Sequence, residues 1–316
     1  MKLRVLLSEY FVLYLSAAYF LALWPFVPEF ASGGNLANIF SNMLPLLVVA
    51  IGQTFVMISG GIDLSVTSVI ALASTTGALV MTGDGGLLAG TPWAIPAGVA
   101  VMLLIGLSLG LLNGVAVTRL RMPPFIVTLT VMMFFSGLAI WLTKSRNIYN
   151  LPAPFTAVGR GTWSVVAVAG ALTVLAHLTL RRSLFGRWLY AVGSNPRTSL
   201  VSGVPVRRTI LSAYVVCGLC AAVAAILYTG RLETGSPVLG QRILLDVIGA
   251  TVIGGTSLFG GRGKVAWTVC GVLFMSLIDN SLNLLGLSNF MVLMAKGLVI
   301  LLAALLDAAR KAYAER

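Results

Sequence analysis

Residues 94–117 read AIPAGVAVMLLIGLSLGLLNGVAV and contain no charged side chain. About 20 mostly apolar residues are enough for a helix to cross the hydrocarbon core of a bilayer. Comparable runs occur along the whole chain and predict further spans at about 10–28, 43–58, 66–82, 125–142, 163–180, 209–229, 265–285 and 291–306. Residues 243–258 are a tenth, weaker candidate, because Asp246 and several glycines interrupt the apolar run.

The composition of the 316 residues agrees with this pattern. Hydrophobic residues make up 58% of the chain and charged residues only 9%, whereas about a quarter of an ordinary soluble domain is charged. So little charge cannot cover a water-soluble surface, which excludes a soluble globular enzyme, a disordered chain and a disulfide scaffold. We therefore expect an all-α integral membrane protein of about ten transmembrane helices, with residues 1–316 forming a single domain surrounded by membrane lipid.

Basic residues predict the orientation of the spans, because cytoplasmic loops are enriched in Lys and Arg. With ten spans and the N-terminus in the cytoplasm, 15 of the 21 Lys and Arg residues fall in cytoplasmic segments and 5 in outer segments. Both termini are therefore expected in the cytoplasm, and the N-terminal apolar run is expected to be a retained span. The basic residues form no stripe with interleaved aromatic residues, so no nucleic-acid partner is expected.

The sequence contains no recognisable catalytic or metal-binding motif. It lacks a G-x-x-x-x-G-K-[ST] motif, and the nearest fragment, Gly260 to Lys264, has the wrong spacing for a P-loop. His177 is the only histidine and has no Cys or Glu cluster near it, so no metal site is expected. Neither a nucleophile elbow nor paired carboxylates occur. These features predict a transporter and not an enzyme.

The longest and most basic cytoplasmic segment, about 181–208, carries strong helix boundary signals. Asn195 suits an N-cap and Pro196 suits the first helical position. Gly203 suits the residue that follows a helix end, and Pro205 prevents continuation. These signals predict a helix of about two turns near 195–203, which is too short to be stable alone in water. A partner protein or the lipid surface must therefore hold it.

Polar residues inside the apolar runs are the candidates for function. Asp279 and Lys296 lie at similar depth in two antiparallel spans, and charges in a bilayer are usually paired or functional, so we expect a buried Asp279–Lys296 ion pair. Asp63 follows two glycines after an apolar run, which indicates either a capped hairpin turn or broken helices beside a polar path. Four polar residues are candidates for a substrate path, with helix packing as the alternative role: Gln53, Asn113, Asn280 and Asn283.

Five segments of this chain resemble signature regions of the membrane permeases of ribose-type ABC sugar importers. They are GQTFVMISGGIDLSVTS (52–68), RMPPFIVTLTVMMFFSGLA (121–139), AVGSNPRTSLVSGV (191–204), VIGGTSLFGGRGKV (252–265) and NSLNLLGLSNF (280–290). They occur in the order typical of that family, and the similarity extends over about 40–306. The chain departs from the family at Thr67, which replaces a usual Gly, at Thr198–Ser199, which replace a frequent Ala-Ala, and at Leu244, which replaces a usual Glu.

The resemblance implies the translocation subunit of a bacterial inner-membrane importer for a monosaccharide or related polyol. Two permease chains, identical or paralogous, would form the pathway, and a periplasmic sugar-binding protein would deliver the substrate. Cytoplasmic ATPase subunits would bind ATP and Mg²⁺, so this chain would carry no cofactor of its own. The short helix and its flanks would dock on the ATPase through Gly193, Asn195, Pro196, Leu200 and Gly203.

A secondary transporter driven by an ion gradient is the alternative function. It would need intramembrane carboxylates that exchange protons or sodium ions, and Asp63, Asp246 and Asp279 are available. However, one of them has a plausible Lys partner, and the sequence shows no obvious inverted repeat.

Overall fold

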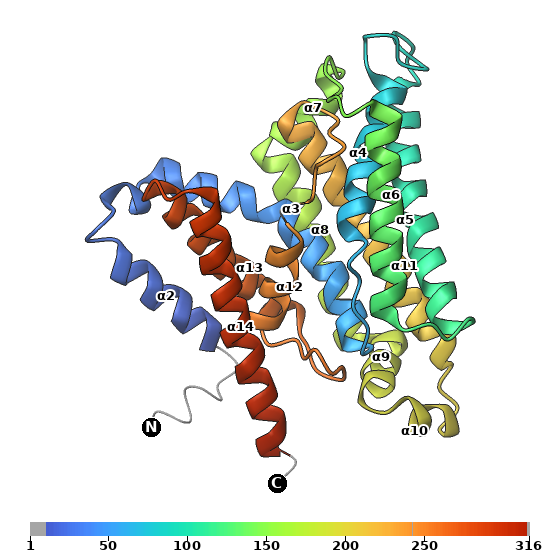
Figure 1. The fold of residues 1–316 in the computed structure, drawn as a ribbon, viewed down its shortest axis with the longest axis vertical. Helices are drawn as coiled ribbons and strands as arrows, with labels where there is room; N and C mark the ends of the chain where they lie inside the picture. The colour runs from blue at the N-terminus through green and yellow to red at the C-terminus, as the bar shows by residue number, and fades with distance from the viewer. Residues whose placement is uncertain (1–10, 242, 315–316) are drawn as a thin grey trace.

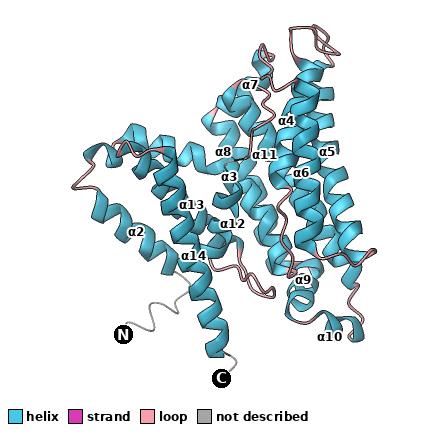
Figure 2. Ribbon diagram, viewed as in Figure 1, coloured by secondary structure: helices cyan, strands magenta, loops and turns pink. Residues whose placement is uncertain are grey.

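The computed structural model describes residues 11–241 and 243–314, which fold into helices joined by turns and loops (Figures 1 and 2). In chain order the helices are α2 (Phe11–Leu23), the 3-10 helix η1 (Pro28–Ala31), α3 (Gly33–Ile58), α4 (Val66–Met81), α5 (Ala94–Thr118), α6 (Pro124–Thr143), α7 (Ala153–Arg160), α8 (Thr162–Arg182), α9 (Leu184–Ser194), α10 (Pro196–Val201), α11 (Val206–Leu232), α12 (Leu244–Ile253), α13 (Val265–Leu284) and α14 (Asn289–Ala314). The all-α fold class is confirmed.

Six helices among the described residues are long and apolar enough to cross a membrane: α3, α5, α6, α8, α11 and α13. The other four expected spans correspond to the shorter apolar helices α2, α4 and α12 and to Asn289–Leu305 of α14. The protein is therefore a multi-pass membrane protein. The two chain ends, 1–10 and 315–316, lie outside the described residues.

Several helix boundaries differ from the sequence expectation. Helix α3 begins at Gly33, ten residues before the expected 43–58, because Ser32 caps it by accepting a hydrogen bond from the Asn35 amide. Helix α12 ends at Ile253, short of the expected 243–258, since Gly255 adopts a positive φ of 104°. Helices α7 and α9 are additions that a search for 20-residue apolar runs does not find.

Helix α3 is the central element of the fold. All of its residues from Met43 to Ile58 are buried, and it packs against α8, α11, α12 and α13. Helices α4, α5, α6 and α11 pack together on one side of it, and α2, α12, α13 and α14 pack together on the other (Figure 1). The chain thus forms two helix groups that are joined through α3.

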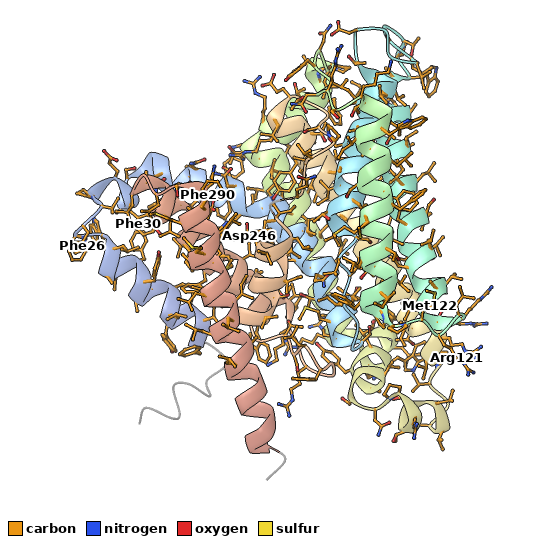
Figure 3. The ribbon with its side chains drawn as sticks, viewed as in Figure 1. Phe26, Phe30, Arg121, Met122, Asp246 and Phe290 are labelled. Atoms are coloured by element: carbon orange, nitrogen blue, oxygen red, sulfur yellow. The ribbon has the colours of Figure 1, made fainter. Side chains whose placement is uncertain are left out.

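The two ends of the molecule carry different elements. Helices α9 and α10 and the C-terminal part of α14 lie at one end, which we call the α10 end (Figure 1). Helix α7 and the loop between α4 and α5 lie at the opposite end, which we call the α7 end. Arg121 and Met122, in the connection between α5 and α6, lie at the α10 end (Figure 3).

Candidate functional site

The turn between α3 and α4 encloses a buried carboxylate near the α10 end. Asp63 accepts hydrogen bonds from the amide of Ser65 at 2.9 Å and from its hydroxyl at 2.6 Å. Asn113 of α5 donates to the Ser65 hydroxyl at 2.7 Å. The Gln53 amide donates to the Asp63 carbonyl at 3.1 Å and accepts from the Asp63 amide at 3.2 Å. These bonds satisfy backbone groups of Asp63 and Ser65, which are both buried.

Two of the four expected path residues belong to this turn. Gln53 and Asn113 are completely buried, the Gln53 amide bonds to the Asp63 backbone, and the Asn113 Nδ2 atom donates to Ser65. Neither residue is part of the cavity described next. Both side chains therefore contribute to packing between helices, which is the role that the sequence analysis gives as the alternative to lining a substrate path.

A polar cavity of about 390 Å³ lies between α3, α11, α12 and α13. It is lined by Asn38, Ile39, Asn42, Leu46, Tyr228, Ile243, Asp246, Met275, Ser276, Asp279, Asn280 and Asn283. The other two expected path residues, Asn280 and Asn283, are therefore brought together at its wall. Four amides, two carboxylates, one hydroxyl and one phenol form a surface that can donate and accept hydrogen bonds in several directions.

Hydrogen bonds hold the amides of the cavity in place. The side chains of Asn280 and Asn35 bond reciprocally, at 2.8 and 2.9 Å, and so connect α13 to the start of α3. Asn42 donates to the Oδ1 atom of Asn38 at 2.8 Å, one turn away on α3. Asn283 donates to the backbone carbonyl of Asp279 at 2.7 Å. The polar wall is thus preorganised by contacts within and between helices.

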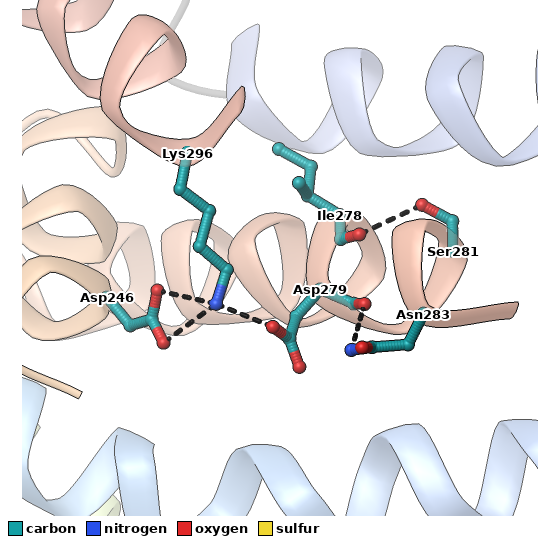
Figure 4. Close-up of polar contacts among 6 residues, drawn as sticks. All are labelled: Asp246, Ile278, Asp279, Ser281, Asn283 and Lys296. Carbon is teal, nitrogen blue, oxygen red and sulfur yellow. Dashed lines mark hydrogen bonds and ion pairs between the residues drawn. The ribbon is translucent and has the colours of Figure 1, made fainter. Parts of the chain in front are cut away.

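Two lining carboxylates, Asp246 and Asp279, form a cluster with Lys296, which is not itself a lining residue (Figure 4). The Nζ atom of Lys296 lies 2.5 Å from Asp279 Oδ1, 3.0 Å from Asp246 Oδ1 and 3.1 Å from Asp246 Oδ2. The structure thus brings Asp279 and Lys296 together and adds Asp246 from α12. The expected burial holds for Lys296, whose side chain is 8% exposed, but not for Asp279, which is 48% exposed. Asp279 borders the open cavity, which explains the difference.

The short helix α10 has the boundaries that its sequence encodes. Asn195 accepts hydrogen bonds from the amides of Arg197 and Thr198, and Pro196 occupies the first helical turn. Gly203 follows the helix with a φ of +81°, a conformation that side chains other than glycine disfavour. The helix spans Pro196–Val201, somewhat less than the expected 195–203.

The tip of α10 presents apolar side chains at the surface. Leu200 is 66% exposed and Val201 is 90% exposed. A six-residue helix cannot maintain itself in water without tertiary support, and apolar residues at its tip favour contact with another surface.

Helix α9 connects α10 to the centre of the fold. The Tyr190 hydroxyl donates to the Gly263 carbonyl at 2.7 Å. Gly193 lies so close to the end of α3 that a Cβ atom there would overlap the Ile58 carbonyl and the Gly261 amide, which are themselves hydrogen-bonded at 2.9 Å. Displacement of α10 would therefore reach the end of α3 and the loop after α12 through direct backbone contact.

Comparison with known proteins identifies the family. Residues 35–304 match the family described as the permease component of the branched-chain amino acid transport system. The chain belongs to this permease family. The match confirms the expectation of a transport protein, since the family consists of permease components and not of enzymes.

Curated relatives of the permease act on sugars, according to their names. The ribose import permease RbsC of Bacillus subtilis (strain 168) is 38% identical over 297 residues, covering 90% of this chain and 88% of the relative. The RbsC protein of Escherichia coli (strain K12) is 33% identical over 291 residues, covering 89% and 87%. The L-arabinose transport system permease AraH of the same strain is 34% identical over 304 residues, covering 95% and 90%. No solved structure matches the permease.

Sequence reasoning misses part of the permease's cavity. Asn38 and Asn42 precede the expected start of the second span, although α3 continues through them and both residues line the cavity. Their spacing of four residues, which puts them on one helical face, is the signal that could have found them. In the sequence, Asp246 interrupts a weakly predicted span and Tyr228 lies within an apolar run. Neither position indicates that the two residues line the same cavity.

Proposed function

We propose that this permease is the translocation subunit of an ATP-driven importer for a monosaccharide or a related polyol in the bacterial inner membrane. The observation that carries the proposal is the amide- and carboxylate-lined cavity within an apolar helix bundle. Its volume of about 390 Å³ suits a small ligand, and its lining offers the hydrogen-bond partners that sugar hydroxyls need. The ribose and arabinose permeases among the relatives support the same substrate class.

Ten spans with both termini in the cytoplasm are the topology that we infer. Six long and four shorter apolar helices are available as spans, and an even number of spans would return the chain to the side on which it starts. Helix α12 has ten residues, about 15 Å of rise, and the loop 254–264 continues its path to the α10 end, where Gly261 bonds to Ile58. Basic residues flank α8, α9 and α10, so the positive-inside rule places the α10 end in the cytoplasm.

In this topology the α10 end faces cytoplasmic partners and the cavity lies toward the outer side. A cytoplasmic ATPase subunit, which binds ATP and Mg²⁺, would dock on α10 through Leu200 and Val201. Its movement would reach α3 through the close contact at Gly193. A periplasmic binding protein would deliver the sugar from the other side, and a second permease chain would complete the pathway.

Replacing Leu200 by glutamate is expected to prevent co-purification of the ATPase subunit while leaving membrane insertion unchanged, because the exposed apolar contact becomes charged. Quantitative mass spectrometry of the affinity-purified complex measures the ATPase-to-permease ratio. Leu87→Glu changes another exposed leucine, at the α7 end, and serves as the control that should leave the ratio unchanged. A normal ratio in the Leu200 variant would count against docking on α10.

Replacing Asn42 by leucine is expected to lower sugar import by about 2- to 12-fold, since one neutral hydrogen bond is worth about 0.5–1.5 kcal/mol. Assembly with the ATPase should remain normal, because Asn42 lines the cavity, to which α10 contributes no residue. Uptake of radiolabelled sugar by cells, normalised to the amount of assembled complex, is the measurement. Asn289→Leu changes an exposed asparagine outside the cavity lining and should have no effect. Equal uptake by the two variants would argue against a sugar path through this cavity.

The function is tested by affinity purification of the tagged permease from its native membrane in mild detergent, with mass spectrometry of the bound proteins. We expect a stoichiometric ABC ATPase subunit. A second permease sequence in the complex would indicate a heterodimer, and its absence would indicate a homodimer. A chain that purifies without an ATPase, under conditions that preserve other ABC complexes, would contradict the proposal.

A further inference from the structure

At the cavity wall the two carboxylates face the open space, and the ammonium group that contacts them does not. Asp246 and Asp279 are both among the lining residues, whereas Lys296 is not. The Lys296 side chain is 8% exposed and approaches the carboxylates from α14, behind the wall (Figure 4). A ligand in the cavity therefore meets carboxylate oxygens before it meets the ammonium group.

The charge count of this wall is also unequal. One ammonium group faces two carboxylates, which leaves one negative charge in excess within the cluster. Arg231, at the end of α11, donates to the Ser41 carbonyl at 3.0 Å and is not part of the lining. Every other described lining residue is uncharged at neutral pH. The cavity surface is therefore acidic.

An acidic surface distinguishes ligands by charge. The Asp279 carboxylate would repel a negatively charged ligand, and this repulsion is stronger in a partly enclosed site than in bulk water. A neutral hydroxyl group instead gains a hydrogen bond to a carboxylate, which is stronger than a bond between two neutral groups. The surrounding amides can both donate and accept, so they bind hydroxyl groups without adding charge.

We propose that Asp246 and Asp279, held in place by Lys296, set the charge selectivity of the cavity. It admits neutral sugars and polyols as well as cationic amino sugars, and it excludes sugar acids and sugar phosphates. This inference rests on the proposed function for the substrate that passes, but the potential of the cavity can be measured without transport.

The potential is tested by chemical labelling of a cysteine at the cavity wall, using the variant Asn283→Cys of the full chain in lipid nanodiscs. Cys217 and Cys220 are buried, and Cys270→Ser removes the remaining, partly accessible thiol. The labelling rates of a cationic trimethylammonium methanethiosulfonate and an anionic sulfonate methanethiosulfonate are compared. Leu87→Cys in the exposed α4–α5 loop supplies the reference ratio. We expect the cationic reagent to be favoured by about three- to tenfold over that reference.

Charge changes at the wall should shift this preference in a defined order. Asp279→Asn removes one lining carboxylate and should bring the normalised ratio close to one. Asn42→Asp adds a carboxylate on α3, leaves the three-residue cluster intact, and should raise the ratio. Asp84→Asn, made in the Asn283→Cys protein only and compared with the unchanged reference, neutralises an acidic residue outside the lining and should leave the ratio unchanged.

A ratio near one in the parent protein, a preference for the anionic reagent, or equal ratios in the Asn42→Asp and parent proteins would overturn the proposal. If sugar import is normal while the labelling shows no charge preference, the proposed function stands and the charge selectivity fails. If the labelling follows the predicted order but no sugar is imported, the charged wall stands and the proposed substrate fails.

Discussion

Replacing Gly193 by alanine is expected to abolish coupled import and to lower the thermal stability of the permease. A methyl group at this position would overlap the Ile58 carbonyl and the Gly261 amide, and both are backbone atoms that cannot rotate away. Overpacking of this kind typically costs about 1–3 kcal/mol. Here the strain would also separate α9 from α3, which is one of the contacts that link α9 and α10 to the membrane helices.

Gly170→Ala is the matched control for this substitution. Gly170 lies within α8, and a Cβ atom there would have no neighbour within 4 Å. Alanine is a better helix former than glycine by about 1 kcal/mol, so this control should fold normally or be slightly more stable. Melting temperature in detergent and ATP-dependent uptake in proteoliposomes are the measurements. Full uptake by the Gly193 variant would refute the role of the α9–α3 contact in coupling.

Replacing Lys296 by methionine is expected to produce the largest loss of stability among changes at the cavity. It leaves Asp246 and Asp279 facing each other without the ammonium group that contacts both. Breaking a buried ion pair by removing one partner typically costs about 3–5 kcal/mol. Most of the variant protein should therefore aggregate or be degraded, which fluorescence-detected size-exclusion chromatography of a tagged chain measures directly.

Removal of all three charges should restore much of the lost stability. The triple variant Lys296→Met, Asp246→Asn and Asp279→Asn leaves no unpaired charge, and neutral replacements of buried ion pairs are often well tolerated. The double variant Lys296→Met and Asp279→Asn should recover less, because Asp246 remains charged and its side chain is only 14% exposed. Equal stability of the single, double and triple variants would show that the cluster is not an interdependent unit.

The long apolar runs predict the boundaries of their helices to within a few residues. Apolar side chains are favoured both where a helix contacts lipid and where it contacts other helices, so the whole helix has an apolar sequence. The expected spans 94–117 and 209–229 correspond to Ala94–Thr118 and Val206–Leu232. The first ten residues of α3, GGNLANIFSN, fall outside the expected span, because three asparagines and two glycines are typical of a loop. Two of those asparagines line the cavity. The polarity that hides this part of α3 is thus the same polarity that makes it part of the site.

Contacts between distant segments explain the rest of what the sequence does not reveal. The depth of two antiparallel spans places Asp279 beside Lys296, but only the packing of α12 against α14 brings Asp246 to the same ammonium group. The same holds for Gly193. The family resemblance assigns Gly193 to the ATPase-docking segment, whereas its backbone contact with Ile58 depends on how α9 lies against α3.

The most direct test of ATP-driven sugar import is uptake by proteoliposomes that contain the purified permease, its ATPase subunit and its sugar-binding protein. We expect uptake of a neutral monosaccharide that requires ATP inside the vesicle and the binding protein outside, and that does not respond to a proton or sodium gradient. Uptake by the permease alone, driven by an ion gradient in the absence of the ATPase, would contradict this account and identify a secondary transporter.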